Sequence, residues 1–212
     1  TWVKPGVSMF TSKPDKMTYE IGELDGRVTE RIKKVAVVLD MAGKAEIVTN
    51  LQGARWSKLL LNCTGSGMST VIGGTFGDVL DNKKAFLCIA HIGDETVKVA
   101  RARGIKMEPM QGTDIGSLTF DNKRELQKVQ ALYLQTFGPH RLLKASMLQD
   151  LEKGRKCEID AINGTVSAWG AKVGVPTPVN DQVVKIIKGI EAGKYTYSLA
   201  NLGLFVLPEV PE

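Results

Sequence analysis

The chain has 212 residues, of which 43% are hydrophobic, so it can bury a substantial core and disorder is not expected. Its net charge of +5 comes from 28 basic and 23 acidic side chains without a run of five or six like charges, which argues against nucleic-acid binding. No apolar stretch approaches the length of a membrane span, and the first residues do not form a signal peptide. A cytoplasmic protein without membrane association is therefore predicted.

The cysteine and histidine content predicts neither a disulfide framework nor a metal site. Cys63, Cys88 and Cys157 are odd in number, widely spaced and form no CxxC pair, so free thiols in a reducing compartment are expected. His91 and His140 have no partner at the spacing of metal ligands or catalytic groups. Both are predicted to be surface or helix-end residues.

The first fifty residues combine strand and helix patterns. Residues 7–12, 16–24 and 44–49 carry β-branched, aromatic or alternating positions typical of strands, and residues 29–42 have a helical period that ends at Gly43. The predicted apolar face of this helix consists of Ile32, Val35, Val38 and Leu39. Because so few strands leave sheet edges uncovered, this part is expected to be the end of an α/β sheet and not a self-contained domain.

From residue 50 onward the pattern is helical. Lys58, Asn62 and Ser66 follow at four-residue steps and therefore share one side of a predicted helix, which directs Leu60 and Cys63 toward a core. Most lysines are solvated, so the pattern alone favours a surface position for Lys58, with a functional role as the alternative.

Gly65, Gly67 and Thr70 form a loose imitation of the GxGxxG dinucleotide fingerprint, with Asp81 some way beyond. The third glycine is missing, the preceding apolar run is only three leucines, and no repeated strand and helix units follow. The nucleotide interpretation is therefore rejected, and the small residues are expected to let helices approach closely.

Two scaffold helices are predicted in the middle of the chain. The first covers residues 86–100 and ends at Gly104, the second lies within residues 121–137, and residues 109–114 form a loop between them. The solvated side of the first helix is expected to consist of Glu95, Lys98, Arg101 and Arg103.

Polar residues are concentrated between residues 146 and 180. Ser146 would lie on the polar face of one helix, and a second helix is predicted to begin at Glu158 and to end at Gly174. A carboxylate in a first turn suits either a cap or a substrate ligand. The apolar positions of this helix are Ile159, Ile162, Val166, Trp169 and Val173. Pro178 is a good first residue for a third helix.

Two long segments resemble the signatures of one family. The run SMLQDLEKGRKCEIDAINGTV, continued by GVPTPVN, is similar to the carboxy-terminal signature of the ketopantoate reductase (2-dehydropantoate 2-reductase) family. The segment WSKLLLNC at Trp56 resembles the second conserved segment of that family. The two segments occur in the right order with roughly the expected helical length between them, and the resemblance covers nearly the whole chain.

The resemblance implies a mainly α fold. Residues 50–212 would be a helical substrate-binding and dimerisation domain of the 6-phosphogluconate-dehydrogenase-like type, and residues 1–49 would be the incomplete carboxy-terminal part of a Rossmann-like nucleotide-binding domain. The site residues that it implies are Lys58 as the general acid, Glu158 as a further catalytic residue, and Asn62, Ser66 and Ser146 as substrate ligands.

The implied activity is the NADPH-dependent reduction of 2-dehydropantoate to pantoate, in pantothenate and coenzyme A biosynthesis, by a homodimer. NADPH would be held mainly by an amino-terminal domain outside this chain, so the chain alone is expected to be inactive, and the choice between NADPH and NADH stays open. Ser66-Gly67 stand where the family usually has Asn-Pro, which keeps a reductase of a different 2-oxo acid as an alternative. A non-catalytic helical dimerisation or binding module is the other alternative, against which the joint retention of the implied site residues argues.

Overall fold

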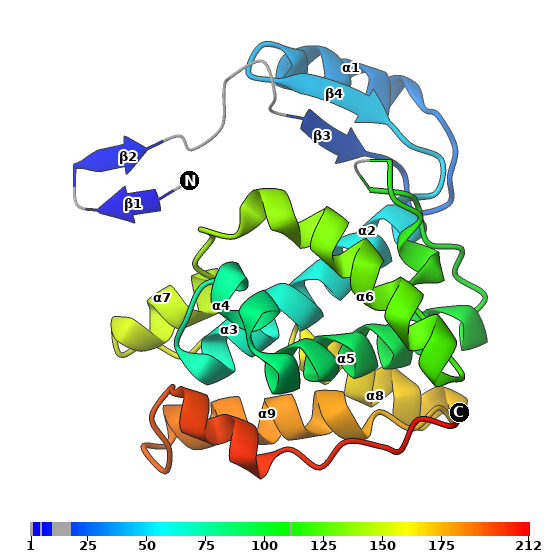
Figure 1. Cartoon of the computed structure of the whole chain (residues 1–212). Helices are drawn as coiled ribbons and strands as arrows, with labels where there is room; N and C mark the ends of the chain where they lie inside the picture. The colour runs from blue at the N-terminus through cyan, green and yellow to red at the C-terminus, as the bar shows by residue number, and fades with distance from the viewer. Residues whose placement is uncertain (1, 5, 10–17, 111) are drawn as a thin grey trace. The chain divides into compact units, whose positions relative to one another are not determined.

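The computed structural model describes residues 1–212 except for residues 1, 5, 10–17 and 111. The chain separates into two compact units, Thr1–Arg55 and Trp56–Glu212 (Figure 1). The first unit mixes strands with a helix and the second is helical, which confirms the predicted mainly α class with a small α/β remnant before it. A helix long and apolar enough to cross a membrane does not occur in the part of the chain that the structure describes.

The amino-terminal unit contains a small strand–helix–strand arrangement. Strands β3 (Thr18–Ile21) and β4 (Lys44–Ile47) pair in parallel, and helix α1 (Glu30–Asp40) connects them. A separate antiparallel hairpin consists of β1 (Trp2–Lys4) and β2 (Val7–Met9). The parts of the predicted strands that lie outside the described residues are 10–12 and 16–17.

Helix α1 begins as predicted but buries a different face. Thr29 is its N-cap, and the Thr29 hydroxyl accepts a hydrogen bond from the Ile32 N–H at 3.2 Å. Ile32 and Ala36 are buried, whereas Val35 and Val38 are 41% and 59% exposed. The predicted apolar face is therefore wrong for Val35 and Val38, because the parallel pair of strands beside α1 covers only a narrow stripe of the helix.

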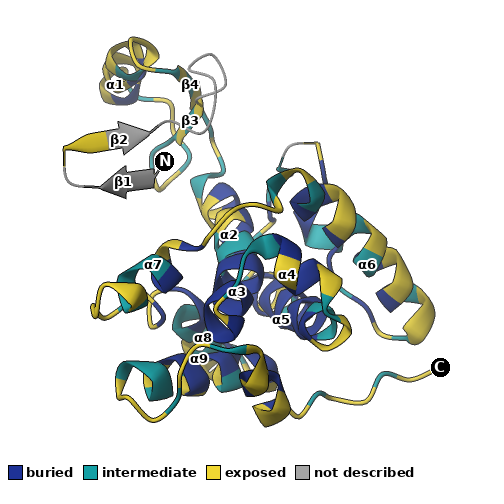
Figure 2. Cartoon of the chain, turned by 60° about the vertical axis from the view of Figure 1, so that its left-hand side comes forward, coloured by how far each residue is buried: buried dark blue, intermediate teal, exposed yellow. Residues whose placement is uncertain are grey.

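The helical unit is built around α5 (Lys83–Ala102), which contacts α4, α6, α8, α9 and η2. Helix α2 (Leu51–Leu61) continues directly into the π-helix η2 (Asn62–Ser66) and then into α3 (Gly67–Ile72). The other helices are α4 (Phe76–Asp81), η3 (Ile115–Ser117), α6 (Lys123–Phe137), η4 (Gly138–His140), α7 (Ser146–Glu152), α8 (Asn163–Val173), α9 (Pro178–Glu191) and η5 (Leu199–Leu204). Buried residues gather on α3 and α5 (Figure 2).

The two predicted scaffold helices are confirmed as α5 and α6, but two polar residues of α5 are not on the surface. Gly104, with φ of +70°, follows the end of α5 as expected. His91 and Glu95 are each only 6% exposed, so the predicted surface positions are wrong. Because neighbouring helices surround α5, His91 packs against the Phe120 ring and Glu95 faces the first turn of α9.

The second predicted helix starts later than its apolar period indicated. Helix α8 begins at Asn163, whereas the backbone from Glu158 onward forms turns in which the N–H groups of Ala161 and Ile162 donate to the Glu158 carbonyl at 3.0 Å. The prediction that Glu158 opens this helix is therefore wrong. Its predicted end is confirmed, because Gly174 caps α8 with φ of +73°.

Candidate substrate site

A cavity of about 280 Å³ lies in the helical unit, near the size of small-ligand sites in proteins. Segments distant in sequence form it: the α2–η2 run, α4, the end of α6 with η4, and the residues that lead into α7. Its polar wall consists of Lys58, Asn62, Ser66, Thr136, His140, Lys144 and Ser146. Its apolar wall contains Leu61, Phe76, Met110, Phe137 and Leu143.

The polar wall carries two lysines and several hydrogen-bonding groups. Lys58, near the end of α2, is exposed, and so is Ser146, the first residue of α7, whereas Ser66 is buried. Lys144 forms an ion pair with Glu152, at the far end of α7. The Lys58 ammonium group, with amide and hydroxyl groups beside it, suits a small anion such as a carboxylate.

The apolar wall depends on a glycine that faces it. The rings of Phe76 and Phe137 meet edge to face, with centroids 5.4 Å apart. A Cβ atom at Gly65 would lie 2.8 Å from the Phe76 ring and 3.0 Å from the Phe137 ring. Gly65 therefore leaves room for both rings beside the cavity, which confirms that the small residues here let elements approach closely.

A π-helix aligns the predicted polar stripe. In an α-helix a step of four residues overshoots one turn by about 40°, so Lys58, Asn62 and Ser66 would drift around the axis. A π turn is wider, and here the Gly67 N–H donates to the Asn62 carbonyl five residues back. The hydroxyl of Thr64 donates to the Leu60 carbonyl at 2.8 Å, which satisfies an acceptor where the helix changes type. The wider turn reverses this drift, so Ser66 returns toward the direction of Lys58.

The structure places four of the five predicted site residues at one cavity. Lys58, Asn62 and Ser66 reach it from the α2–η2 run, and Ser146 reaches it from α7. Glu158 does not line the cavity; it is exposed in the turn before α8. Two segments far apart in the sequence therefore contribute polar side chains to one cavity.

The family model described as "Ketopantoate reductase PanE/ApbA C terminal" matches residues 50–191, which is more than half of the chain. The chain belongs to this family. A 2-dehydropantoate 2-reductase from Archaeoglobus fulgidus is 28% identical over 174 residues, which are 82% of this chain and 52% of that protein. The chain spans about half the length of the curated relatives that it matches.

Solved structures share the fold. A D-mandelate dehydrogenase, in a ternary structure with NADH and anilino(oxo)acetate, matches with a TM-score of 0.67 and 26% identity over 84% of this chain and 53% of that one. The 2-dehydropantoate 2-reductase from Methylococcus capsulatus matches with a TM-score of 0.64 and 26% identity over 86% of this chain and 57% of that one. The neighbours of this ketopantoate reductase-family chain thus include oxidoreductases with different named substrates.

Among the described residues of this chain, the glycines that imitate a dinucleotide fingerprint do not form a turn that could bind a dinucleotide cofactor. Gly65 and Gly67 are buried within η2 and α3, and a Cβ atom at Gly67 would lie 2.9 Å from the side chain of Asn163. Their backbone is part of a packed helix and not of a turn open to a pyrophosphate, which agrees with the rejected fingerprint. Groups of His, Cys, Asp or Glu that could hold a metal ion are also absent from the described residues.

Sequence reasoning missed several residues of this ketopantoate reductase-family cavity. His140 lies in η4 and lines the cavity, although it was expected only at a surface or helix end. Thr136 and Phe137 come from the end of α6, where the apolar period predicts only a scaffold helix. Lys144 precedes Ser146 by two residues, so its closeness to a predicted site residue was the one signal available.

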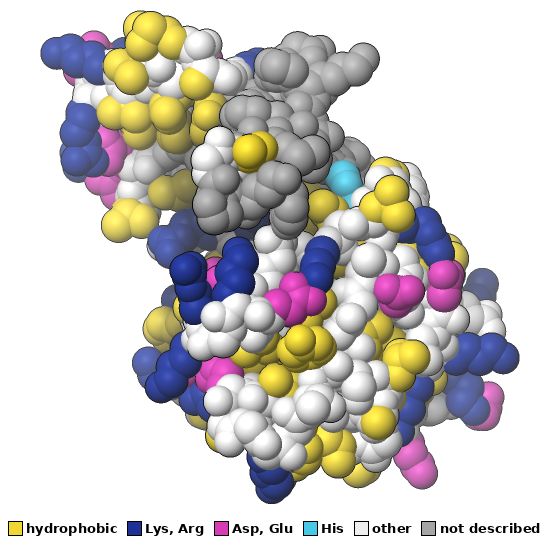
Figure 3. Space-filling model, turned by 90° about the vertical axis from the view of Figure 1, so that its left-hand side faces the viewer, with side chains coloured by type: hydrophobic (Ala, Val, Ile, Leu, Met, Phe, Trp, Pro, Cys, Tyr) yellow, Lys and Arg dark blue, Asp and Glu magenta, His cyan; other side chains and the backbone are white. Residues whose placement is uncertain are grey.

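On the face drawn in Figure 3, basic and acidic side chains are interspersed over the helical unit.

Proposed function

We propose that this chain is the substrate-binding and proton-donating portion of a nicotinamide-dependent 2-oxo acid reductase that resembles ketopantoate reductase. The observation that carries the proposal is the convergence of Lys58, Asn62 and Ser66 with the first turn of α7 on one cavity. Relatives named 2-dehydropantoate 2-reductase support 2-dehydropantoate as the substrate and pantoate, a precursor of pantothenate and coenzyme A, as the product.

In this proposal Lys58 is the general acid. Its ammonium group donates a proton to the carbonyl oxygen of the substrate and stabilises the negative charge that develops there. Asn62, Ser66 and Ser146 can donate hydrogen bonds to carboxylate and hydroxyl oxygens of the substrate. When bound, NADPH supplies the hydride, and we assign its binding mainly to an additional amino-terminal domain. A catalytic role for Glu158 stays a prediction of the resemblance.

A second candidate is a reductase of a 2-oxo acid with a larger apolar group. The edge-to-face pair of Phe76 and Phe137 offers an apolar wall, and Ser66-Gly67 replace the Asn-Pro that is usual in the family. A neighbour of known structure is a D-mandelate dehydrogenase with a bound anilino(oxo)acetate, whose name denotes an aromatic 2-oxo acid derivative. These observations favour testing an aromatic 2-oxo acid beside 2-dehydropantoate.

Titration of the ¹⁵N-labelled chain with 2-dehydropantoate or benzoylformate, followed by NMR, tests the proposal. We expect amide shifts at residues 61–66 and 143–146, and we expect Lys58→Ala to weaken binding roughly tenfold or more through loss of a charge-assisted hydrogen bond. Lys128→Ala, which removes an exposed lysine from α6, is the matched control and should bind like the wild type. Equal effects of the two variants would overturn the role of Lys58. Absence of shifts at the cavity with both acids would favour the non-catalytic module.

The proposal also includes a cytoplasmic homodimer, which the resemblance implies. Sedimentation equilibrium of the chain over the micromolar range tests the dimer. A monomer at all concentrations would contradict this part of the proposal and would leave the assignment of the cavity intact.

A further inference from the structure

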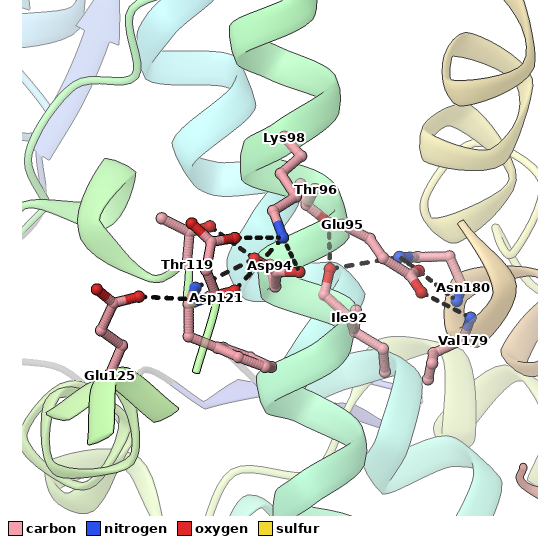
Figure 4. A network of polar contacts seen from close by, with 11 residues as sticks. Ile92, Asp94, Glu95, Thr96, Lys98, Thr119, Asp121, Glu125, Val179 and Asn180 are labelled. Carbon is pink, nitrogen blue, oxygen red and sulfur yellow. Dashed lines mark hydrogen bonds and ion pairs between the residues drawn. The ribbon is translucent and has the colours of Figure 1, made fainter. Parts of the chain in front are cut away.

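A buried relay of hydrogen bonds links α5, α9 and α8 to the π-helix beside the cavity. The Glu95 carboxylate accepts from the N–H groups of Val179 and Asn180 at 2.8 and 2.9 Å, and from Asn180 Nδ2 at 2.7 Å (Figure 4). Asn180 Oδ1 accepts from Asn163 Nδ2 at 3.0 Å, and Asn163 Nδ2 also donates to the Cys63 carbonyl at 3.1 Å. The relay therefore ends on the backbone of η2, between Asn62 and Ser66.

The direction of the relay follows from its end on α5. The Ile92 carbonyl can only accept, and it lies 3.3 Å from Asn180 Nδ2, so the amide nitrogen of Asn180 must face α5 and its oxygen must face Asn163. That oxygen and the Cys63 carbonyl are both acceptors, so the amide nitrogen of Asn163 must lie between them. Cys63, Asn163 and Asn180 are fully buried. A reversed amide would therefore leave buried polar groups without hydrogen bonds, which would lower the free energy of unfolding.

The side-chain amide of Asn163 uses its nitrogen for two hydrogen bonds and leaves its oxygen unpaired among the described residues. Its Nδ2 serves both acceptors, while its Oδ1 is buried without a hydrogen-bond partner within the described part of the chain. Gly67 lies beside that oxygen, since a Cβ atom there would come within 2.9 Å of it. Buried side-chain oxygens in native proteins usually accept a hydrogen bond. The unpaired Oδ1 therefore indicates that the two hydrogen bonds of Nδ2 set the orientation of Asn163.

We propose that Asn163 and Asn180 are positioning residues, which act through the Cys63 carbonyl to hold the π-helix in the geometry that directs Asn62 and Ser66 into the cavity. The Ile92 carbonyl and Glu95 set the orientation of both amides. A π-helix is less stable than the α-helix that flanks it, so an outside donor on one of its carbonyls favours the wider turn. The consequence for ligand affinity rests on the proposed function, whereas the effect on η2 does not.

Asn163→Asp tests the relay with almost no change in volume. Because a carboxyl group buried between two acceptors has a raised pKa, the measurement is made at a pH high enough to ionise it. The ionised group can donate neither to the Cys63 carbonyl nor to Asn180, so the π-helix loses its outside donor. We expect amide hydrogen exchange at residues 66–68 to be roughly tenfold faster in the variant than in the wild type, after correction for any change in global unfolding. We also expect the ¹³C chemical shift of the Cys63 carbonyl to change. Lowering the pH until the introduced carboxyl group is protonated restores a donor and should reverse the carbonyl shift. Affinity for 2-dehydropantoate, or for benzoylformate if that acid binds better, should fall in parallel.

Ile187→Val is the matched control, because Ile187 is fully buried on α9 and its apolar side chain forms none of the hydrogen bonds of the relay. It should lower global stability without selective exchange at residues 66–68. If the Asn163→Asp variant does not fold, Asn163→Ala replaces it, since this change leaves the bonds between Glu95 and α9 in place. Unchanged exchange and an unchanged Cys63 carbonyl signal in the relay variant would overturn the proposal. Failure of the wild type to bind either 2-oxo acid would instead count against the proposed function, while the exchange result would still decide the relay.

Discussion

Lys58 is the residue on which the proposed chemistry most depends. In a reductase that contains this chain, we expect Lys58→Ala to lower kcat by about 10² or more, because the carbonyl oxygen would lose the general acid assigned to it as the hydride arrives. The measurement is the steady-state oxidation of NADPH with 2-dehydropantoate and with benzoylformate, with Lys128→Ala as the control. Turnover close to the wild type with every 2-oxo acid tested would remove Lys58 from the role of general acid.

Glu95 makes the stability of the helical unit depend on pH. Burial raises the pKa of Glu95 to about 7 from its ordinary value of 4.5, against the hydrogen bonds from Asn180 and Val179, which favour the ionised form. The folded protein then binds this proton more tightly than the unfolded chain does, so ionisation of Glu95 opposes folding. The contribution of Glu95 to the free energy of unfolding should therefore fall as the pH rises from about 4.5 to about 7, by roughly 3 kcal/mol in total, and should level off above that.

Chemical denaturation of the wild type and of Glu95→Gln, at intervals between pH 4.5 and 8.5, measures this effect. The glutamine is neutral and of the same size, and its oxygen can accept from Asn180, but its nitrogen cannot accept from the Val179 N–H. That lost bond lowers the stability of the variant by a similar amount at every pH, so the pH-dependent part of the difference reports the ionisation of Glu95. The difference between the two proteins should change with pH as described. Parallel stability profiles over the whole range would contradict the raised pKa.

The residues of the cavity were predictable where they share a helix or fall in a family motif, as Ser146 does, and unpredictable elsewhere. The four-residue spacing placed Lys58, Asn62 and Ser66 on one side of a helix, and the structure brings all three to the cavity. His140 carries no such signal, because its position depends on how the end of α6 meets the α2–η2 run. Glu95 shows the same limit: the helical period of α5 does not reveal that the amino terminus of α9 lies opposite it.

At the scale of elements, the packing of η2 against α4 and α6 depends on Gly65. In Gly65→Ala the new methyl group would collide with Phe76 and Phe137, so we expect a loss of about 1–3 kcal/mol in the free energy of unfolding. Gly203→Ala is the matched control, because Gly203 is exposed in η5, has no positive φ and has open space where its Cβ atom would lie. It should be neutral, or more stable by up to about 1 kcal/mol. Thermal or urea unfolding of both variants measures the contrast, and equal stabilities would show that the rings yield without cost.

Helix ends were predictable from local chemistry, while changes within helices were not. Gly104 and Gly174 follow α5 and α8 with the positive φ that favours glycine, so the expected ends are confirmed. The start of α8 was placed too early, because Ile162 keeps the apolar period although its backbone is not helical. The π-helix was not predicted, since small residues at positions 64–67 continue an ordinary helical pattern and only the packing of Asn163 distinguishes it.

For the molecule as a whole, we expect the chain by itself not to bind NADPH tightly. The described residues contain no glycine-rich turn between a strand and a helix that could hold a pyrophosphate, since Gly65 and Gly67 lie inside a packed helix. Isothermal titration calorimetry of the 212-residue chain with NADPH is the measurement. Binding at micromolar or lower Kd would contradict this expectation and would require a cradle formed by other residues.

The π-helix also makes the length of the α2–η2–α3 run part of the site. A π turn accommodates one more residue than an α turn does, so the run could close into an uninterrupted α-helix with all its residues kept only if one flank turned relative to the other. Everything before the π turn would then rotate by about 100° relative to α3. Lys58 would swing away from Ser66, and Trp56 and Leu60, which are now buried, would leave the core with it. A change of helix type that keeps every cavity side chain would thus remove both the proposed proton donor from the cavity and part of the core.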